Sequence, residues 1–334
     1  MNVLDSEPRQ KPRGTIEIAR DWLDDSGELA LATVVSTWGS APVPVGGQLV
    51  IGTGSRFEGS VSGGCVEAEV ITEAEDVLAS DRPKLLEFGI GDETAWRAGL
   101  PCGGTIKVYV EPLRRERDRR YLEAVLAARL ARRWLGVLTT LETGARHLFD
   151  TPESMSAEIA TGAHESRLVE FGDAFLNVLL PPVRLVIVGA THIGQVLADL
   201  AQRIGYDVIV VDPRTAFASE ERFGQIEKLT EWPELSFKGL KLDARTAVVT
   251  LTHAAALDDE ALRESLKANC LYIGALGSKR ANAQRLERLR GQGFSEEDLM
   301  RIHAPVGMSI GAKGPAEIAV SILADIINTS RGGL

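Results

Sequence analysis

Cysteine is scarce in this chain. Three cysteines, Cys65, Cys102 and Cys270, are spread over 334 residues and form no CxxC pair. A number that is both odd and small excludes a disulfide framework and fits a reducing cytoplasm. The same scarcity disfavours a tetrahedral zinc site built from thiolates. We therefore expect a cytoplasmic protein whose cysteines are reduced.

Positive charge is also in short supply. The chain has 37 Lys and Arg against 47 Asp and Glu, a formal net charge of -10. No basic excess exists to neutralise the phosphates of a nucleic acid. The one locally basic run, residues 114–120, alternates with Glu116 and Asp118, which indicates a solvated helix face. We expect no nucleic-acid partner.

The sequence lacks a long uninterrupted apolar run. Its most apolar stretch, residues 174–190, is broken by Asn177, Pro181, Pro182 and Arg184. It is therefore unsuited to span a membrane. The polar N-terminus contains no apolar core of the kind that an export signal needs. We expect no membrane partner and no export.

The length predicts two domains, because single hydrophobic cores stop growing well below this size. The pair Pro181-Pro182 cannot continue a helix or a central strand and marks the boundary. The sequence therefore predicts an α/β protein with an N-terminal domain over residues 1–181 and a C-terminal domain over residues 182–334.

The C-terminal domain begins with the pattern of a Rossmann fold. An apolar strand, residues 184–188, enters the turn Gly189-Ala-Thr-His-Ile-Gly194, and a helix follows over residues 195–204. A second apolar strand then ends in Asp212, which follows Gly189 by 23 residues. This is the spacing of the acid that binds a ribose hydroxyl. The candidate nucleotide-binding residues are Gly189, Thr191, His192, Ile193, Gly194, Asp212 and Arg214.

One position departs from that motif. Thr191 stands where the middle glycine would let the backbone approach a pyrophosphate. Its hydroxyl could donate a hydrogen bond to a phosphate oxygen, or its side chain could block the approach. Asp212 favours NAD over NADP, and Arg214 nearby weakens that preference.

Two further predicted strands of this sheet end in polar residues. Residues 246–252 lead to His253, and residues 271–275 lead to Gly277, Ser278 and Lys279. Ligands bind at the carboxyl ends of such strands, and amides before a helix hold anions. His253 is either a general base or ligand anchor, or a strand-end histidine that hydrogen-bonds to the backbone.

The N-terminal domain carries three glycine-bearing loops. They are Trp38-Gly-Ser with Pro42 and Pro44, then Gly59-Ser-Val-Ser-Gly-Gly-Cys-Val-Glu67, then Pro101-Cys-Gly-Gly104. Strands are expected over residues 29–37, 48–52 and 105–111, and a helix follows the second loop. With the motifs VGATHIG, VDPR, YIGALGSKR and HAPVG of the second half, these loops resemble the XdhC/CoxI family over about residues 15–328.

The resemblance implies an accessory role. Members of this family are thought to bind molybdenum cofactor, to protect it during sulfuration by a cysteine desulfurase, and to deliver it to a xanthine dehydrogenase-type molybdenum hydroxylase. We also expect a homodimer. Because molybdopterin carries a phosphate, glycine turns with free amides suit it. The resemblance makes Ser62, Gly63, Gly64, Cys65, Glu67, Cys102, Gly103 and Gly104 the candidate cofactor-binding residues of this domain.

Two of the cysteines are candidates for direct contact with the cargo. Cys65 lies at the start of a helix, whose dipole favours a thiolate. That thiolate could contact molybdenum or carry sulfur transiently, and Cys102 could do the same if the two loops converge. The alternative is that both are small buried residues packed among glycines. Cys270, beside an apolar strand, is interpreted as a core residue.

The chain departs from the family pattern at three places. Val43 stands between the two prolines where many relatives carry arginine, and Ala254 and Ala255 replace a second histidine that often follows the Thr-His pair. The third place is Thr191. Two other hypotheses therefore stay open: an NAD(P)-dependent oxidoreductase with His253 as acid or base, and a protein–protein adaptor without a working site.

Overall fold

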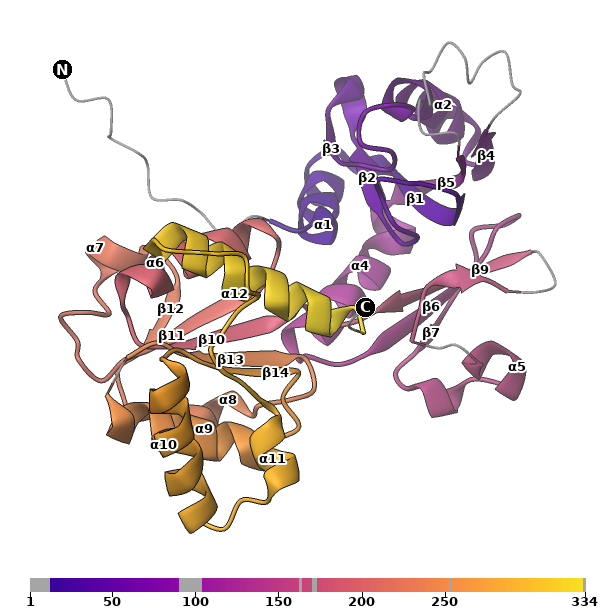
Figure 1. Cartoon of the computed structure of the whole chain (residues 1–334). Coiled ribbons are helices and arrows are strands. Elements are labelled where there is room, and N and C mark those ends of the chain that lie inside the picture. Colours follow the sequence, from indigo (N-terminus) through magenta and orange to yellow (C-terminus); the bar gives the residue numbers. More distant parts are fainter. Residues whose placement is uncertain (1–12, 90–103, 162–163, 170–172, 253, 333–334) are drawn as a thin grey trace, which may run out of the picture. The chain divides into compact units, whose positions relative to one another are not determined.

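The computed structural model describes residues 13–89, 104–161, 164–169, 173–252 and 254–332. The chain forms two compact units, Arg13–Pro181 and the segment from Pro182 onward (Figure 1).

A five-stranded antiparallel sheet forms the centre of the first unit, in the order β3-β2-β1-β5-β4. Its strands are β1 Glu28–Trp38, β2 Gln48–Ile51, β3 Phe57–Gly59, β4 Lys84–Phe88 and β5 Thr105–Arg114. The helices α1 Thr15–Ser26 and α4 Arg115–Leu130 pack on one face, and α2 Glu67–Ser80 packs on the other.

Strand β1 shows why both faces of this sheet are covered. Leu29 and Leu31 join the core beneath α1 and α4, whereas Ala30, Ala32 and Val34 join the core beneath α2. Because alternate side chains point to opposite faces, a continuous apolar run is buried on both sides.

A second antiparallel sheet completes this unit, in the order β7-β6-β9-β8. Its strands are β6 Leu135–Thr140, β7 Arg146–Phe149, β8 Arg167–Leu168 and β9 Ala174–Leu179. Three short helical turns accompany the two sheets: η1 Thr53–Ser55, η2 Pro152–Ser154 and α5 Ala157–Ala160. The apolar stretch 174–190 is thus two strands, β9 and β10, separated by Pro181-Pro182. Of the helices in the described residues, none has the length and apolar character to cross a membrane.

The second unit is built on a six-stranded parallel sheet in the order β12-β11-β10-β13-β14-β15. Its strands are β10 Arg184–Val188, β11 Asp207–Val211, β12 Glu227–Leu229, β13 Thr246–Thr250, β14 Tyr272–Ala275 and β15 Ile302–His303. Numbered from β10, this is the strand order 3-2-1-4-5-6 of a doubly wound nucleotide-binding fold. The predicted Rossmann-type fold is confirmed.

Helices cover both faces of the parallel sheet (Figure 1). They are α6 His192–Arg203, α7 Glu220–Phe223, α8 Pro233–Leu240, α9 Ala255–Lys267, α10 Lys279–Gly291, α11 Glu296–Met300 and α12 Pro315–Ser330. Leu185 and Ile187 of β10 pack toward α6 and α12, and Val186 and Val188 pack toward α8 and α9. Helix α6 begins at His192, three residues before the predicted start, because Thr191 caps it.

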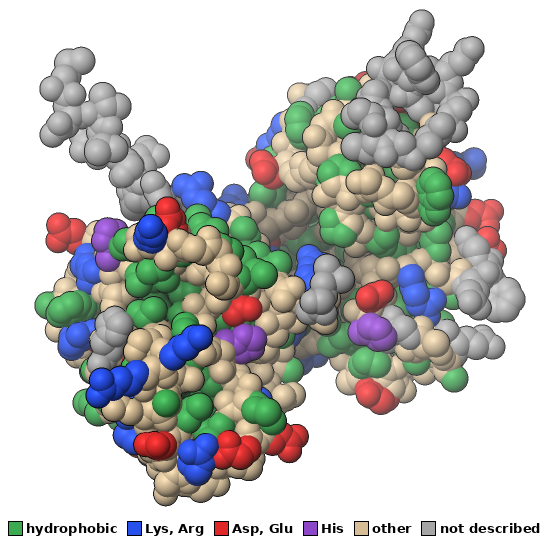
Figure 2. All heavy atoms as spheres, viewed as in Figure 1, with side chains coloured by type: hydrophobic (Ala, Val, Ile, Leu, Met, Phe, Trp, Pro, Cys, Tyr) green, Lys and Arg blue, Asp and Glu red, His purple; other side chains and the backbone are tan. Residues whose placement is uncertain are grey.

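The outer surface of the second unit carries charges of both signs. On its visible face, basic side chains are interspersed with acidic and apolar ones (Figure 2). Such a mixture is typical of a solvated surface.

Candidate functional site

In the first unit, the glycine loop before α2 is closed by the carboxylate of Glu67. Its Oε1 accepts hydrogen bonds from the amides of Val61 (3.2 Å) and Ser62 (2.9 Å) and from the hydroxyl of Ser60 (2.7 Å). Its Oε2 accepts from the amide of Gly64 (2.9 Å) and from the Ser62 hydroxyl. One carboxylate therefore collects five donors from the loop that precedes it.

The two serine hydroxyls hold the remaining amides of this loop. Ser60 Oγ accepts from the amide of Gly63 at 2.8 Å, and Ser62 Oγ accepts from those of Cys65 and Val66, each at 2.9 Å. All six amides from 61 to 66 are thus hydrogen-bonded to side chains of the same segment. In this conformation an external anion would have to displace Glu67.

The charge of Glu67 follows from these contacts. The residue is only 8% exposed. Burial opposes its ionisation, but the hydrogen bonds from Ser62 and Ser60 outweigh it and lower the pKa of this carboxyl to about 2. Glu67 is therefore a fixed negative charge beneath the loop at neutral pH.

Cys65 is held by this closed loop. Gly63 and Gly64, which precede it, have φ angles of 77° and 113°, in the region that favours glycine. The Cys65 side chain is a free, half-buried thiol that packs against the core formed by α2 and the five-stranded sheet. The loop thus fixes the thiol just before the first turn of α2.

The glycine-bearing loops of this unit meet at one end of the sheet. A Cβ on Gly63 would lie 3.4 Å from Cγ of Pro42, and a Cβ on Gly104 would lie 2.6 Å from the carbonyl oxygen of Trp38. The segment from Trp38 to Pro42 therefore contacts both other loops. Cys102 and Gly103 lie outside the described residues.

The Rossmann turn of the second unit needs its first and last glycines for packing. Gly189 has a φ of 112°, and a Cβ there would lie 2.7 Å from Cγ2 of Thr252. A Cβ on Gly194 would lie 2.8 Å from the carbonyl oxygen of Gly189. Thr191 occupies the middle position as the N-cap of α6, with its hydroxyl oxygen accepting from the Gly194 amide at 3.1 Å. Of the neighbouring side chains, His192 is exposed and Ile193 is half-buried.

Asp212 directly follows β11 and is fully buried, and both oxygens of its carboxylate accept hydrogen bonds. Its Oδ2 accepts from the Ala190 amide and from Nη2 of Arg214, each at 2.8 Å. Its Oδ1 accepts from the Arg214 amide at 3.0 Å and from Nε of Arg214 at 2.9 Å. The Arg214 guanidinium also stacks 4.3 Å from the ring centre of Phe217.

These contacts set both the charge and the availability of Asp212. Burial opposes its ionisation, but the hydrogen bonds from Arg214 and from the Ala190 amide keep the pKa of the carboxyl below its ordinary value. A ribose hydroxyl would have to replace Arg214, because each oxygen already accepts two hydrogen bonds.

Two buried ionic side chains that the sequence did not single out, Asp258 and Arg285, contact the segments that follow β13 and β14. Asp258 accepts from the hydroxyl of Thr252 at 2.6 Å, and Nη2 of Arg285 lies 3.7 Å from the same carboxylate. Arg285 also donates to the carbonyl of Leu276 at 2.9 Å. Asp258 belongs to α9 and Arg285 to α10, and no sequence motif marks either position as functional. His253 lies outside the described residues.

The turn before α10 is the segment for which the sequence predicted anion binding. Gly277 has a φ of 146°, and Ser278 caps α10 by accepting from the Ala281 amide at 3.2 Å. Ser278 and Lys279 are exposed, so both side chains can be reached from solvent.

Two further features concern metal-ligand side chains and the third cysteine. Within the described residues, no group of three or more His, Cys, Asp or Glu side chains is placed to hold a metal ion. Cys270 packs between two core clusters, and burial raises the pKa of its thiol to about 12. It is a half-buried residue that packs against the core of this unit.

Comparison with known proteins extends over both units. Residues 22–89 match the model of the XdhC and CoxI family, and residues 185–326 match that of the XdhC Rossmann domain. The chain is 31% identical to a probable xanthine dehydrogenase subunit of Bacillus subtilis, over 92% of this chain and 95% of that protein. It is 32% identical to the molybdenum cofactor insertion chaperone PaoD of Escherichia coli, over 89% of this chain and 81% of that protein.

A solved structure is similar over almost the whole chain. The crystal structure of a xanthine dehydrogenase from Bacillus halodurans has a TM-score of 0.80 and 25% sequence identity, covering 96% of each chain. The two family models include the glycine loop of the first unit and most of the Rossmann unit. The resemblance inferred from the motifs is confirmed, and the chain belongs to the XdhC and CoxI family.

Proposed function

We propose that this protein is an accessory factor that binds molybdenum cofactor and supports its sulfuration and insertion into a xanthine dehydrogenase-type molybdenum hydroxylase. The observation that carries the proposal is the 32% identity to a molybdenum cofactor insertion chaperone over 89% of this chain. That match is longer than either unit, so the likeness includes parts of both.

The cysteine loop supports the proposal through its rigidity. A carrier needs a site that is formed before the cargo arrives, because ordering a flexible loop on binding costs affinity. Glu67 and two serines hold every amide around Cys65. The free thiol of Cys65 is the group that we assign to contact with the molybdenum end of the cargo.

Taken by itself, the second unit carries a candidate anion site in the turn before α10. Since Glu67 already occupies the amides of the cysteine loop, that loop offers no free anion site in its described conformation. The turn from Gly277 to Lys279 lies before a 13-residue helix, and its Ser278 and Lys279 side chains are exposed. Amides at a helix N-terminus together with a lysine suit a phosphate group.

The geometry of Asp212 weighs against the oxidoreductase hypothesis. A dinucleotide-binding Rossmann site uses this acid for the ribose hydroxyls. Here both carboxylate oxygens are taken by Arg214 and the Ala190 amide. Reduced nicotinamide nucleotide should therefore bind weakly, and no hydride transfer is expected.

Cofactor retention tests the proposal. The purified full-length protein is incubated with molybdenum cofactor released from a molybdoenzyme and passed through a desalting column. Denaturing extraction and pterin fluorescence then measure the cofactor that stays bound. We expect retention by the wild type and a loss of about tenfold in affinity for Cys65→Ala, in line with the removal of one charged or metal-directed contact.

Cys270→Ala is the matched control, because this half-buried thiol packs against the core of the second unit, whereas the glycine loop before α2 belongs to the first. It should retain the cofactor fully, and Cys102→Ala is measured in parallel. No retention by the wild type would refute the proposed cargo. Full retention by Cys65→Ala would remove this thiol from the site while leaving the cargo in place.

A further inference from the structure

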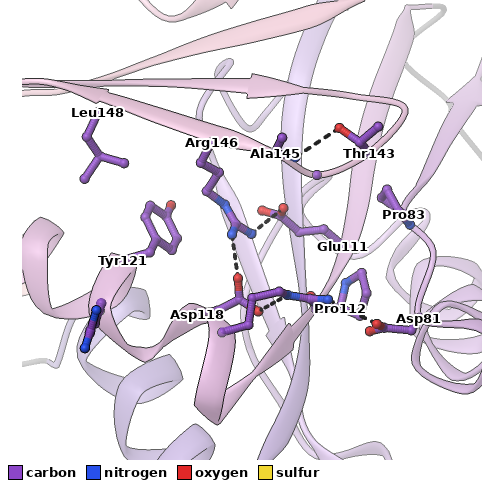
Figure 3. A pocket seen from close by; sticks show the side chains of 13 residues that line it. Asp81, Pro83, Glu111, Pro112, Asp118, Tyr121, Thr143, Ala145, Arg146 and Leu148 are labelled. Carbon is purple, nitrogen blue, oxygen red and sulfur yellow. Dashed lines mark hydrogen bonds and ion pairs between the residues drawn. The ribbon is translucent and has the colours of Figure 1, made fainter.

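A pocket with a cavity volume of about 430 Å³ lies inside the first unit (Figure 3). It is formed where the end of α2, strand β5, the start of α4 and the β6–β7 hairpin meet. Volumes of a few hundred Å³ are typical of small-molecule sites. Apolar contributions come from Pro83, Pro112 and Leu148, and the polar ones converge on a buried arginine.

The buried arginine is Arg146, whose side chain is 10% exposed. Its guanidinium donates to Asp118 Oδ1 at 2.7 Å and to Glu111 Oε2 at 2.5 Å, and it lies 4.4 Å from the ring centre of Tyr121. Figure 3 shows Glu111 and Asp118 both directed toward it. The side chains of these two acids are 6% and 3% exposed.

The two buried acids are not equally satisfied. Asp118 Oδ2 accepts from the amide of Arg114 at 2.8 Å and from Nε of Arg117 at 2.9 Å, so both oxygens of Asp118 are bonded. Glu111 receives only the one bond from Arg146, and its Oε1 has no partner in the part of the chain that the structure describes. Burial, together with the charge of Asp118, raises the pKa of the Glu111 carboxyl. Glu111 therefore lacks one N–H donor, and a cationic donor would stabilise its ionised form.

The pocket also contains a positive charge without a carboxylate partner in the described part of the chain. Arg120 lines the pocket, is exposed, and makes no ion pair among the described residues. Its neighbour Arg117 is already bound to Asp81 and Asp118. The pocket thus offers a Glu111 carboxylate oxygen without a hydrogen-bond donor and an exposed Arg120 guanidinium without an ion pair, both judged over the described residues.

We propose that this pocket binds a small zwitterion of the α-amino-acid class with an apolar side chain. The ammonium group donates to Glu111 Oε1, and the carboxylate pairs with Arg120. The side chain lies against Pro83 and Pro112. One ligand then satisfies both unpaired groups without changing the net charge of the pocket.

This site is separate from the cysteine loop. Asp81, at the pocket, directly follows the last residue of α2, whereas Cys65 lies before its first residue. A 14-residue helix is about 21 Å long at 1.5 Å per residue. The two sites are therefore independent, and amino-acid binding can be present or absent whatever the cargo of the protein is.

Calorimetric titration of the full-length protein with the standard L-amino acids tests the proposal. We expect at least one apolar amino acid to bind with a Kd of about 1 mM or below. Its N-acetyl derivative, which lacks the ammonium group, and its decarboxylated amine should each bind at least about tenfold more weakly, because each loses a charge-assisted hydrogen bond.

Two variants locate the site. Glu111→Gln and Arg120→Gln should each weaken binding about tenfold or more. Arg120 is exposed, so its variant tests the site even if Glu111→Gln fails to fold, which circular dichroism would reveal. Arg119→Gln is the matched control, because Arg119 is on the same helix but pairs with Asp24 and Glu123. Absence of binding by every amino acid at about 10 mM, or equal binding by wild type and Arg120→Gln, would overturn the proposal.

Discussion

The glycine loop before α2 and the Rossmann turn before α6 are both held by a buried carboxylate, but the hydrogen-bond donors to the two carboxylates differ. Each is a glycine-rich turn closed by a carboxylate of the chain itself. Glu67 receives five donors, all of them amides or hydroxyls of its own loop. Asp212 receives two amides and the guanidinium of Arg214.

The two carboxylates differ in how easily their hydrogen-bond donors can be replaced by water. The donors to Glu67 are backbone amides and short side chains, which cannot leave without unfolding the loop. The partner of Asp212 is a long side chain that is 42% exposed and that solvent can hydrate. We infer that the cysteine loop is rigid, whereas the Arg214 side chain of the Rossmann turn can hydrate when its partner is removed.

Removing the Glu67 carboxylate should have the largest effect on stability. Glu67→Ala leaves buried amides and hydroxyls without an acceptor, and we expect the free energy of unfolding of the first unit to fall by about 3 kcal/mol. Chemical denaturation measures it, and faster hydrogen exchange at the amides of 61–66 would locate the damage. Glu75→Ala, at an exposed position of the same helix, is the control. A change of below about 0.5 kcal/mol in Glu67→Ala would show that the loop does not depend on this carboxylate.

Acid should destabilise the first unit through the same carboxylate. The pKa of Glu67 falls from an ordinary 4.5 to about 2 on folding, so its ionised form stabilises the folded state above pH 4.5. That contribution is lost as the pH falls from about 4.5 to about 2 and amounts to about 3 kcal/mol. Unfolding measured between pH 6 and pH 2 should show this loss in the wild type and a clearly smaller one in Glu67→Ala. Identical pH dependence in the two proteins would contradict the assignment.

Asp212→Ala should have a smaller effect, because Arg214 can turn to solvent once its partner is gone. We expect the second unit to lose about 2 kcal/mol, chiefly from the unsatisfied amide of Ala190. Differential scanning calorimetry would measure the loss, with Glu221→Ala at an exposed site as the control. A loss larger than that in Glu67→Ala would reverse the proposed ranking of the two turns.

The strand and helix order of the Rossmann unit could be predicted from the sequence. The strand pairing of the first unit could not. The order strand, glycine turn, helix, strand and Asp212 is local, and parallel strands read as continuous apolar runs. The pairing of β1 with β5 joins Glu28 to Arg114, far apart in the chain, and no pattern in either strand specifies it. Helix α6 begins three residues before the predicted start because Thr191, which the sequence indicates as a phosphate contact or a steric block, caps the helix instead.

The candidate site was predictable by residue type but not by partner. The resemblance makes Glu67 a candidate cofactor-binding residue, and nothing in the sequence shows that its carboxylate turns back onto its own loop. Asp212 was expected at the end of β11, but its pairing with Arg214 depends on side-chain direction. Glu111 and Arg146, which share the pocket of the first unit, come from strands 35 residues apart.

Delivery of the cargo is the most direct test of the proposed role. A cofactor-free molybdenum hydroxylase of the xanthine dehydrogenase type is mixed with molybdenum cofactor, either free or bound to this protein, and the recovered activity is measured. The account predicts that the bound cofactor restores about tenfold or more activity than the same amount of free cofactor, with Cys65→Ala intermediate between the two. Equal recovery from free and bound cofactor would contradict it.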